Sequence, residues 1–106
     1  MGSDDEIYEY LGQLFEWNVM KAARNAIKHR VRFTEAASVF FDENAVFEPD
    51  PDHSEEENHY LVLGRSIRRN VLLVVHVIRA ERVRLISARD ATPAERSRYD
   101  ERRRGF

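Results

Sequence analysis

The stretch RVRLISARDATPAERSRY, residues 82–99, predicts a strand that runs almost directly into a helix. Its first half is apolar and basic, as expected of a strand, and Thr92 then suits the N-cap of a helix. Pro93 fits the first helical position, and Glu95 stands at the third. The side chains of Thr92 and Glu95 can therefore bond each other's backbone N–H groups as a capping box. Local chemistry fixes this turn.

The strand carries three side chains that suit an anionic ligand, namely Arg84, Ser87 and Arg89. Because the turn after them is well defined, we expect them to be held in a fixed geometry. The alternative is a structural strand whose arginines are solvated.

A hairpin is predicted before this strand, with Ala80 and Glu81 as a two-residue turn. Its register would pair Arg79 with Arg82, Val74 with Ser87, His76 with Leu85 and Leu72 with Arg89. One sheet face would then hold His76, Ser87 and Arg89. The opposite face would carry Val75, Val77, Ile86 and Ala88, and a slip of one residue would exchange the two faces.

The length of 106 residues and the 42% hydrophobic content predict one domain, residues 1–106, with one core. Residues 1–13 are expected to be a helical turn or a disordered lead-in, and residues 102–106 a frayed basic tail. No apolar run is long enough to span a bilayer, and no charged-then-apolar leader begins the chain. The absence of cysteine excludes disulfides, thiolate zinc sites and cysteine nucleophiles, and fits a cytoplasmic protein.

Hydrophobic periodicity predicts the order βααββββα and an α+β class, with two N-terminal helices packed on a mainly antiparallel sheet and a helix at the C-terminus. Strands are expected at 14–17, 45–49, 59–66, 70–79 and 82–89, and helices at 19–29, 34–41 and after residue 92. Asn18 and Thr34 are the expected N-caps of the first two helices.

The helix at 19–29 has two predicted sides. Its buried side would comprise Val19, Ala22, Ala23, Ala26 and Ile27. Its polar stripe comprises Lys21, Arg24, Asn25 and Lys28. A solvated surface is the simpler interpretation of the stripe.

The net charge of −2 conceals an uneven distribution. Residues 1–60 carry 5 Lys/Arg against 14 Asp/Glu, whereas residues 61–106 carry 12 against 5. If the second part forms one face, that face attracts polyanions, because steering follows the local potential. Alternatively, the two parts neutralise each other across the fold.

The four histidines occupy different settings. His29 ends a helix, where a cation interacts well with the dipole, and His53 lies in an acidic loop where we expect it to be exposed. His59 begins a strand, and His76 interrupts an apolar strand as either a core histidine or a phosphate-facing one. Without an HExxH motif or a compact His/Asp pair, the sequence predicts no zinc site, and it contains no motif for a cofactor.

An ordered set of motifs resembles the BrnT family of type II toxins. It comprises FEWNVMKAARNAIKH (15–29), RFTEAASVFFD (32–42), LVLGRS (61–66), VLLVVHVIR (71–79) and the opening stretch. The resemblance implies a RelE-like ribonuclease fold, growth arrest through RNA cleavage, and inhibition by a BrnA-type antitoxin with a ribbon-helix-helix part that binds operator DNA.

The resemblance also implies functional positions. They are Lys21, Asn25, Lys28, His29, His76, Arg84, Ser87, Arg89, Glu95 and Tyr99. Three residues depart from the family's pattern. Asn18 replaces an Asp and Arg30 a Gly, both tolerable substitutions, whereas His59 replaces an Arg. If that Arg binds the scissile phosphate, this chain is weakened or uses His59 instead.

The predicted activity is that of a metal-independent endoribonuclease, which needs a base, a phosphate-binding cation and an acid. The expected catalytic residues are Arg89 and Arg84 with Arg79 in support, His76 as leading acid or base, and His59 as the second choice. The expected RNA contacts are Lys21, Lys28, Arg65 and Ser87. The alternative is a module without catalysis that binds nucleic acid or only its antitoxin.

Overall fold

A computed structural model describes residues 4–53, 55 and 58–105. In chain order these form β1 (Asp5–Tyr10), β2 (Gln13–Asn18), α1 (Val19–His29), α2 (Phe33–Ser38), the 3-10 helix η1 (Val39–Phe41), β3 (Val46–Pro49), the 3-10 helix η2 (Pro51–His53), β4 (His59–Arg65), β5 (Val71–Arg79), β6 (Arg82–Asp90) and α3 (Pro93–Arg103). The predicted α+β class is confirmed. The predicted states of residues 1–3 and 106 lie outside the described residues, and the predicted frayed tail at 102–106 begins too early, because α3 continues to Arg103.

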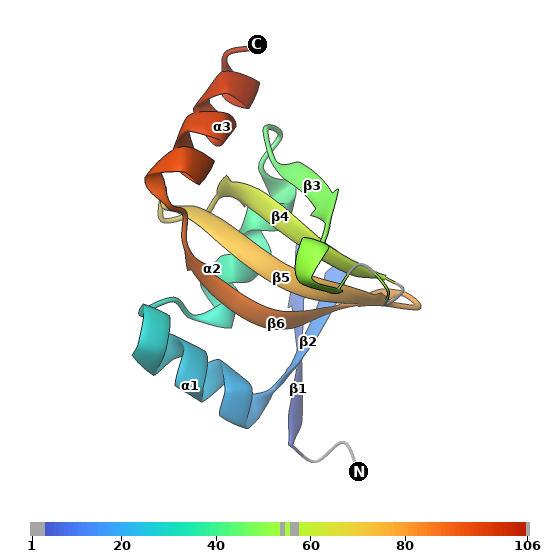
Figure 1. Ribbon diagram of the computed structural model, residues 1–106. Coiled ribbons are helices and arrows are strands. Elements are labelled where there is room, and N and C mark those ends of the chain that lie inside the picture. The colour runs from blue at the N-terminus through green and yellow to red at the C-terminus, as the bar shows by residue number, and fades with distance from the viewer. Residues whose placement is uncertain (1–3, 54, 56–57, 106) are drawn as a thin grey trace.

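The six strands form one sheet in the order β1-β2-β6-β5-β4-β3. The β2–β6 pair is parallel and all others are antiparallel. Figure 1 shows α1 beside the lower edge of the sheet, α2 behind the sheet, and α3 projecting from its upper end. Among the described residues, no helix has the length and apolar character needed to cross a membrane.

The helical turn or disordered lead-in predicted before residue 13 is wrong. Residues 5–10 instead form a strand at the edge of the sheet. β1 pairs with β2 from Asp5 opposite Asn18 to Tyr10 opposite Gln13. The two-residue turn between them has positive φ at both Leu11 and Gly12, the geometry of a type I′ hairpin turn. Leucine is an unusual residue in such a turn, so the sequence contains little signal for it.

The two faces of the sheet differ in what covers them. The covered face packs against α2 and η1 through a core that includes Phe15, Val62, Leu72, Val74 and Leu85. The other face, which we call the open face, is built from the alternate residues of the strands. On this face Val75 of β5 is paired with Leu61 of β4 on one side and with Ser87 of β6 on the other. At one end of the open face, Tyr99 of α3 packs with Leu63, Val71 and Leu73.

Helix α1 begins at the predicted cap, because the Asn18 side chain accepts a hydrogen bond from the Lys21 N–H. Its predicted buried side is correct only for Ala22 and Ala26, which are half-buried. Val19, Ala23 and Ile27 are exposed, Ile27 to 82%, and the buried residue is Asn25. The Asn25 amide bonds both the N–H and the C=O of Ala88, at 3.0 and 2.9 Å, and this contact sets the rotation of the helix against β6.

The start of α2 also differs from its prediction. The helix begins at Phe33, one residue before Thr34, and Arg32 occupies the N-cap position without a side-chain hydrogen bond. Phe33 is buried and packs edge-on against Trp17, with ring centroids 5.7 Å apart. Core packing of Phe33 therefore draws the first turn back beyond the expected cap.

Candidate functional site

The hairpin of β5 and β6 decides which side chains meet on the open face. Its turn at residues 80–81 and the Arg79–Arg82 pair are as predicted, and so is His76 opposite Leu85. A register shift between Val75 and His76 then places Val75, not Val74, opposite Ser87. The predicted register beyond this point is wrong, because a bulge adds one residue to β6.

The bulge separates His76 from the arginines that it was expected to join. Arg89 is opposite Leu73 on the open face, whereas His76 is 1% exposed on the covered face. Its ring packs against Phe40 with centroids 4.7 Å apart and against Tyr60 at 6.0 Å. Burial lowers the pKa of His76 to about 4 and outweighs a weak backbone contact to Val74. His76 is thus a neutral core histidine.

Arg89 lies at the end of β6 and is held by α3. Its two terminal nitrogens donate to the two oxygens of Glu95 at 2.8 and 3.0 Å. Glu95 also completes the predicted capping box with Thr92. The hydrogen bonds from Arg89, with those from Thr92, lower the pKa of Glu95 to about 2 despite partial burial. The Arg89 side chain is 37% exposed.

Arg84 and Arg79 lie in a separate ion-pair cluster around Glu16 of β2. Arg84 donates to Glu16 at 2.8 Å and bonds both oxygens of Asp5 at 3.1 and 3.2 Å. Burial alone would raise the pKa of Glu16, but hydrogen bonds from Arg84 and Arg82 hold it below its usual value. Arg79 lies 3.7 Å from Glu16 and is largely exposed at the hairpin tip. Two carboxylates therefore balance the charge of Arg84. Because Asp5, Glu16 and Arg84 come from three strands, the cluster joins β1, β2 and β6.

Beside Arg89, a surface hollow of about 420 Å³ opens on the open face. We call it the loop hollow, and it is lined by Asp50, Pro51, Asp52, His53, Leu61, Leu73, Val75, Ile86, Ser87, Arg89 and Glu95. Its volume falls in the range of ligand sites. The hollow brings together two predicted site residues, Ser87 and Arg89.

The loop hollow also contains a pair that the sequence analysis did not select. His53 Nδ1 lies 2.9 Å from a carboxylate oxygen of Asp50, and the Asp50 side chain is only 4% exposed. The rings of His53 and His59 stack with centroids 5.0 Å apart. A buried carboxylate orients an imidazole for proton transfer. The D-x-x-H spacing across Pro51 was the available signal, since a proline after Asp50 favours a tight turn.

A second hollow lies between α1 and β6. We call it the α1 hollow, and it is lined by Lys21, Arg24, Asn25, Lys28, His29, Ile86 and Ser87. It shares Ile86 and Ser87 with the loop hollow. The structure therefore brings the predicted residues Lys21, Lys28 and Ser87 together and places Arg89 in the adjoining hollow.

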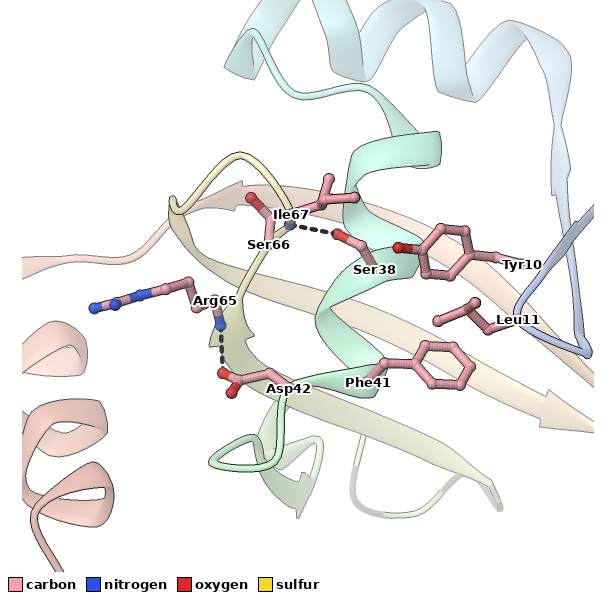
Figure 2. A pocket seen from close by; sticks show the side chains of 8 residues that line it. All are labelled: Tyr10, Leu11, Ser38, Phe41, Asp42, Arg65, Ser66 and Ile67. Carbon is pink, nitrogen blue, oxygen red and sulfur yellow. Dashed lines mark hydrogen bonds between the residues drawn. The ribbon is translucent and has the colours of Figure 1, made fainter.

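Arg65 lies elsewhere. Its guanidinium sits over the Tyr99 ring, 5.7 Å from the centroid, and its backbone N–H donates to Asp42 at 2.7 Å. Figure 2 shows the third hollow that Arg65 borders, where Tyr10, Leu11 and Phe41 gather on one side and the Arg65 side chain points away. The structure does not bring Arg65 to the lysines of α1.

These features define a small α+β protein with two adjoining hollows, one lined by cations of α1 and the other by Arg89 and an Asp–His pair. Residues 17–95 match the sequence profile of the family described as "Ribonuclease toxin, BrnT, of type II toxin-antitoxin system". The chain belongs to this family, which confirms the resemblance.

Comparison with solved structures supports the same fold. The 1.1 Å crystal structure of the Brucella abortus ribonuclease toxin BrnT matches with a TM-score of 0.56 and 19% sequence identity, over 72% of this chain and 92% of that one. Comparison with curated protein sequences gave no match.

Proposed function

We propose that this BrnT-family toxin is a metal-independent endoribonuclease whose active site lies where the two hollows meet. The observation that carries the proposal is the shared wall at Ile86 and Ser87. Through it, the cations of α1 lie on a continuous surface with Arg89 and His53. Such a surface suits a strand of RNA, with backbone contacts on α1 and chemistry in the loop hollow.

The proposed reaction requires no group beyond these side chains. A base takes the proton of an RNA 2′-hydroxyl, whose oxygen bonds to the adjacent phosphorus while the bond from phosphorus to the 5′-oxygen breaks. An acid protonates the departing 5′-oxygen, and a 2′,3′-cyclic phosphate remains. His53, oriented by Asp50, is the proposed base, and His59 beside it is the proposed acid. In this reaction His59 has a catalytic role, and the buried His76 does not.

Arg89 is the proposed phosphate-binding residue. Its guanidinium is always charged and suits bidentate contact with phosphate oxygens. The ion pair with Glu95 holds the guanidinium in one orientation and leaves it partly exposed to the hollow. The proposed RNA contacts are Lys21, Lys28 and Ser87. Arg84 and Arg79 have a structural role in the Glu16 cluster and no proposed catalytic one.

The wider biology is proposed from the family. We infer growth arrest in the cytoplasm, a RelE-like relationship of the fold, and neutralisation by a BrnA-type ribbon-helix-helix antitoxin that also binds operator DNA. Expression of this chain alone should slow bacterial growth, and the co-encoded antitoxin should restore it. Normal growth at high soluble expression would contradict the toxin role.

The decisive experiment is cleavage of RNA by the purified chain in EDTA, with analysis of the fragment ends. We expect 2′,3′-cyclic or 3′-phosphate ends, and a loss of about a hundredfold or more for Arg89→Ala and for His53→Gln. Arg68→Ala is the matched control, because Arg68 is an exposed cation in the β4–β5 turn outside both hollows. Equal cleavage by wild type and Arg89→Ala would refute the assignment of Arg89.

A second candidate function is binding without catalysis, and one observation favours it. The charge of Arg89 is already paired with Glu95, so the described site offers fewer uncommitted cations than its sequence suggests. In this case the purified chain would retain intact RNA in a salt-dependent manner and yield no fragments.

A further inference from the structure

Three potential metal ligands converge beside the loop hollow, and two of them, Asp50 and His53, line it. One ligand atom each from Asp50, His53 and His59 lies within 4.8 Å of the others. This is the combination of two imidazoles and one carboxylate that several catalytic zinc sites use. The sequence predicted no zinc site, for want of an HExxH motif or a compact His/Asp pair, but Asp50 and His53, three residues apart, form such a pair.

Main-chain hydrogen bonds build this cluster. The β3–β4 ladder ends with Pro49 opposite Tyr60, and the Asp50 N–H extends it by donating to the carbonyl of His59 at 3.1 Å. The N–H of His53 donates to the carbonyl of Asp50, also at 3.1 Å. The Asp50 carboxylate is further fixed by the N–H of Asp52 at 3.0 Å. The backbone positions of all three ligands are therefore set before any metal binds.

We propose that Asp50, His53 and His59 form a binding site for Zn²⁺. Bonds of about 2.0 to 2.2 Å in a tetrahedron place ligand atoms roughly 3.3 Å apart, so the cluster needs only a small contraction. The His53 side chain is 45% exposed, so an ion can reach it from solvent. Three protein ligands leave a fourth position for water. Mg²⁺ and Ca²⁺ fit poorly, because they prefer oxygen ligands.

Zinc at this site would inhibit RNA cleavage. A metal-bound imidazole has no lone pair with which to take a proton, so Zn²⁺ withdraws both His53 and His59 from acid–base chemistry. This consequence rests on the proposed function, whereas the zinc site itself rests only on its ligands.

Calorimetric titration of the tag-free chain with ZnCl₂ tests the site. We expect one Zn²⁺ per chain, no heat with MgCl₂, and affinity reduced by at least about tenfold in His59→Gln and in Asp50→Asn. His29→Gln is the matched control, because His29 lies on α1 in the other hollow, and it should bind zinc as the wild type does. Circular dichroism and the melting temperature establish that each variant is folded. Absence of binding by the wild type, or equal affinity in both ligand variants, would overturn the proposal.

A second measurement separates the site from the function. In the cleavage assay, stoichiometric Zn²⁺ should stop the wild type, and EDTA should restore it. Zinc binding without any RNA cleavage would refute the ribonuclease proposal and leave the site intact. Cleavage that is unaffected by zinc, together with absent calorimetric binding, would refute the site and leave the ribonuclease.

Discussion

The ion pair between Arg89 and Glu95 joins the end of β6 to the first turn of α3, and Glu95→Gln removes its charge with little change of shape. Glutamine keeps an oxygen that can accept the Thr92 N–H, so the capping box is largely retained. The variant therefore isolates the two hydrogen bonds from Arg89 to the carboxylate.

The magnitude follows from the pKa of Glu95. Arg89 is the main cause that lowers this pKa from 4.5 to about 2. At 1.36 kcal/mol per pKa unit the interval corresponds to roughly 3 kcal/mol in favour of the ionised carboxylate. Arg89 is 37% exposed, so solvent screening reduces the contribution to about 1 to 2 kcal/mol. For a chain of this length, the melting temperature should fall by about 4 to 8 °C at pH 7.

The pH dependence of this loss provides the sharper test. Because the folded-state pKa lies below the unfolded-state value, the ion pair stabilises the fold fully above about pH 4.5 and loses its effect as the pH falls toward 2. Thermal unfolding of wild type and variant should therefore differ at pH 7 and converge near pH 2. Glu48→Gln is the control, since its pair with Arg98 is exposed and should contribute at most about 1 kcal/mol. A difference that stays constant from pH 7 to pH 2 would refute the reasoning.

Three further perturbations test the core and the docking of α3. The folded-state pKa of His76 is about 4, below the unfolded value of 6.5, so the wild type should lose up to roughly 3 kcal/mol of folding stability as the pH falls from 6.5 to 4. In thermal unfolding over this pH range, His76→Gln should lose less stability. An equal loss in the variant would contradict burial of the ring. Tyr99→Phe removes a 2.6 Å hydrogen bond to Asp42 and should cost about 1.5 to 3 kcal/mol, with faster amide exchange throughout α3; unaltered exchange would show that Tyr99 is not the anchor. Gly64→Ala places a Cβ 2.8 Å from Val39 Cγ1 and should lower stability by about 1 to 3 kcal/mol in urea, whereas an unchanged midpoint would show that the site has room.

The parts of the fold that were predictable from sequence are those set by neighbouring residues. The Asn18 cap, the Thr92–Glu95 capping box and the turn at residues 80–81 each depend on a few adjacent side chains. Each appears in the structure as expected, because local hydrogen bonds suffice to form it. The rotation of α1 was missed, since it depends on Asn25 and Ala88, which lie 63 residues apart.

The candidate site was predicted in part for the same reason. Ser87 and Arg89 lie on one face of β6 as expected, but the bulge in β6 opposite Val75 and His76 has no sequence signature and places them on the other sheet face from His76. The Asp50–His53 pair was not predicted, because its place in the loop hollow depends on the tertiary fold. A polar residue in a loop reveals little about its role until the strand opposite it is known.

The contact between Asn25 and Ala88 has a consequence for association with other chains. Parallel pairing of β2 with β6 ends at Arg84, so the rest of β6 presents a strand edge, and one primary amide takes the place of the missing peptide group there. An incoming strand that extended the sheet at this edge would have to displace Asn25 and turn α1 outward. Strand addition at β6 is thereby coupled to the position of α1. A partner that bound in this way would move the polar stripe, with its lysines, away from Ser87.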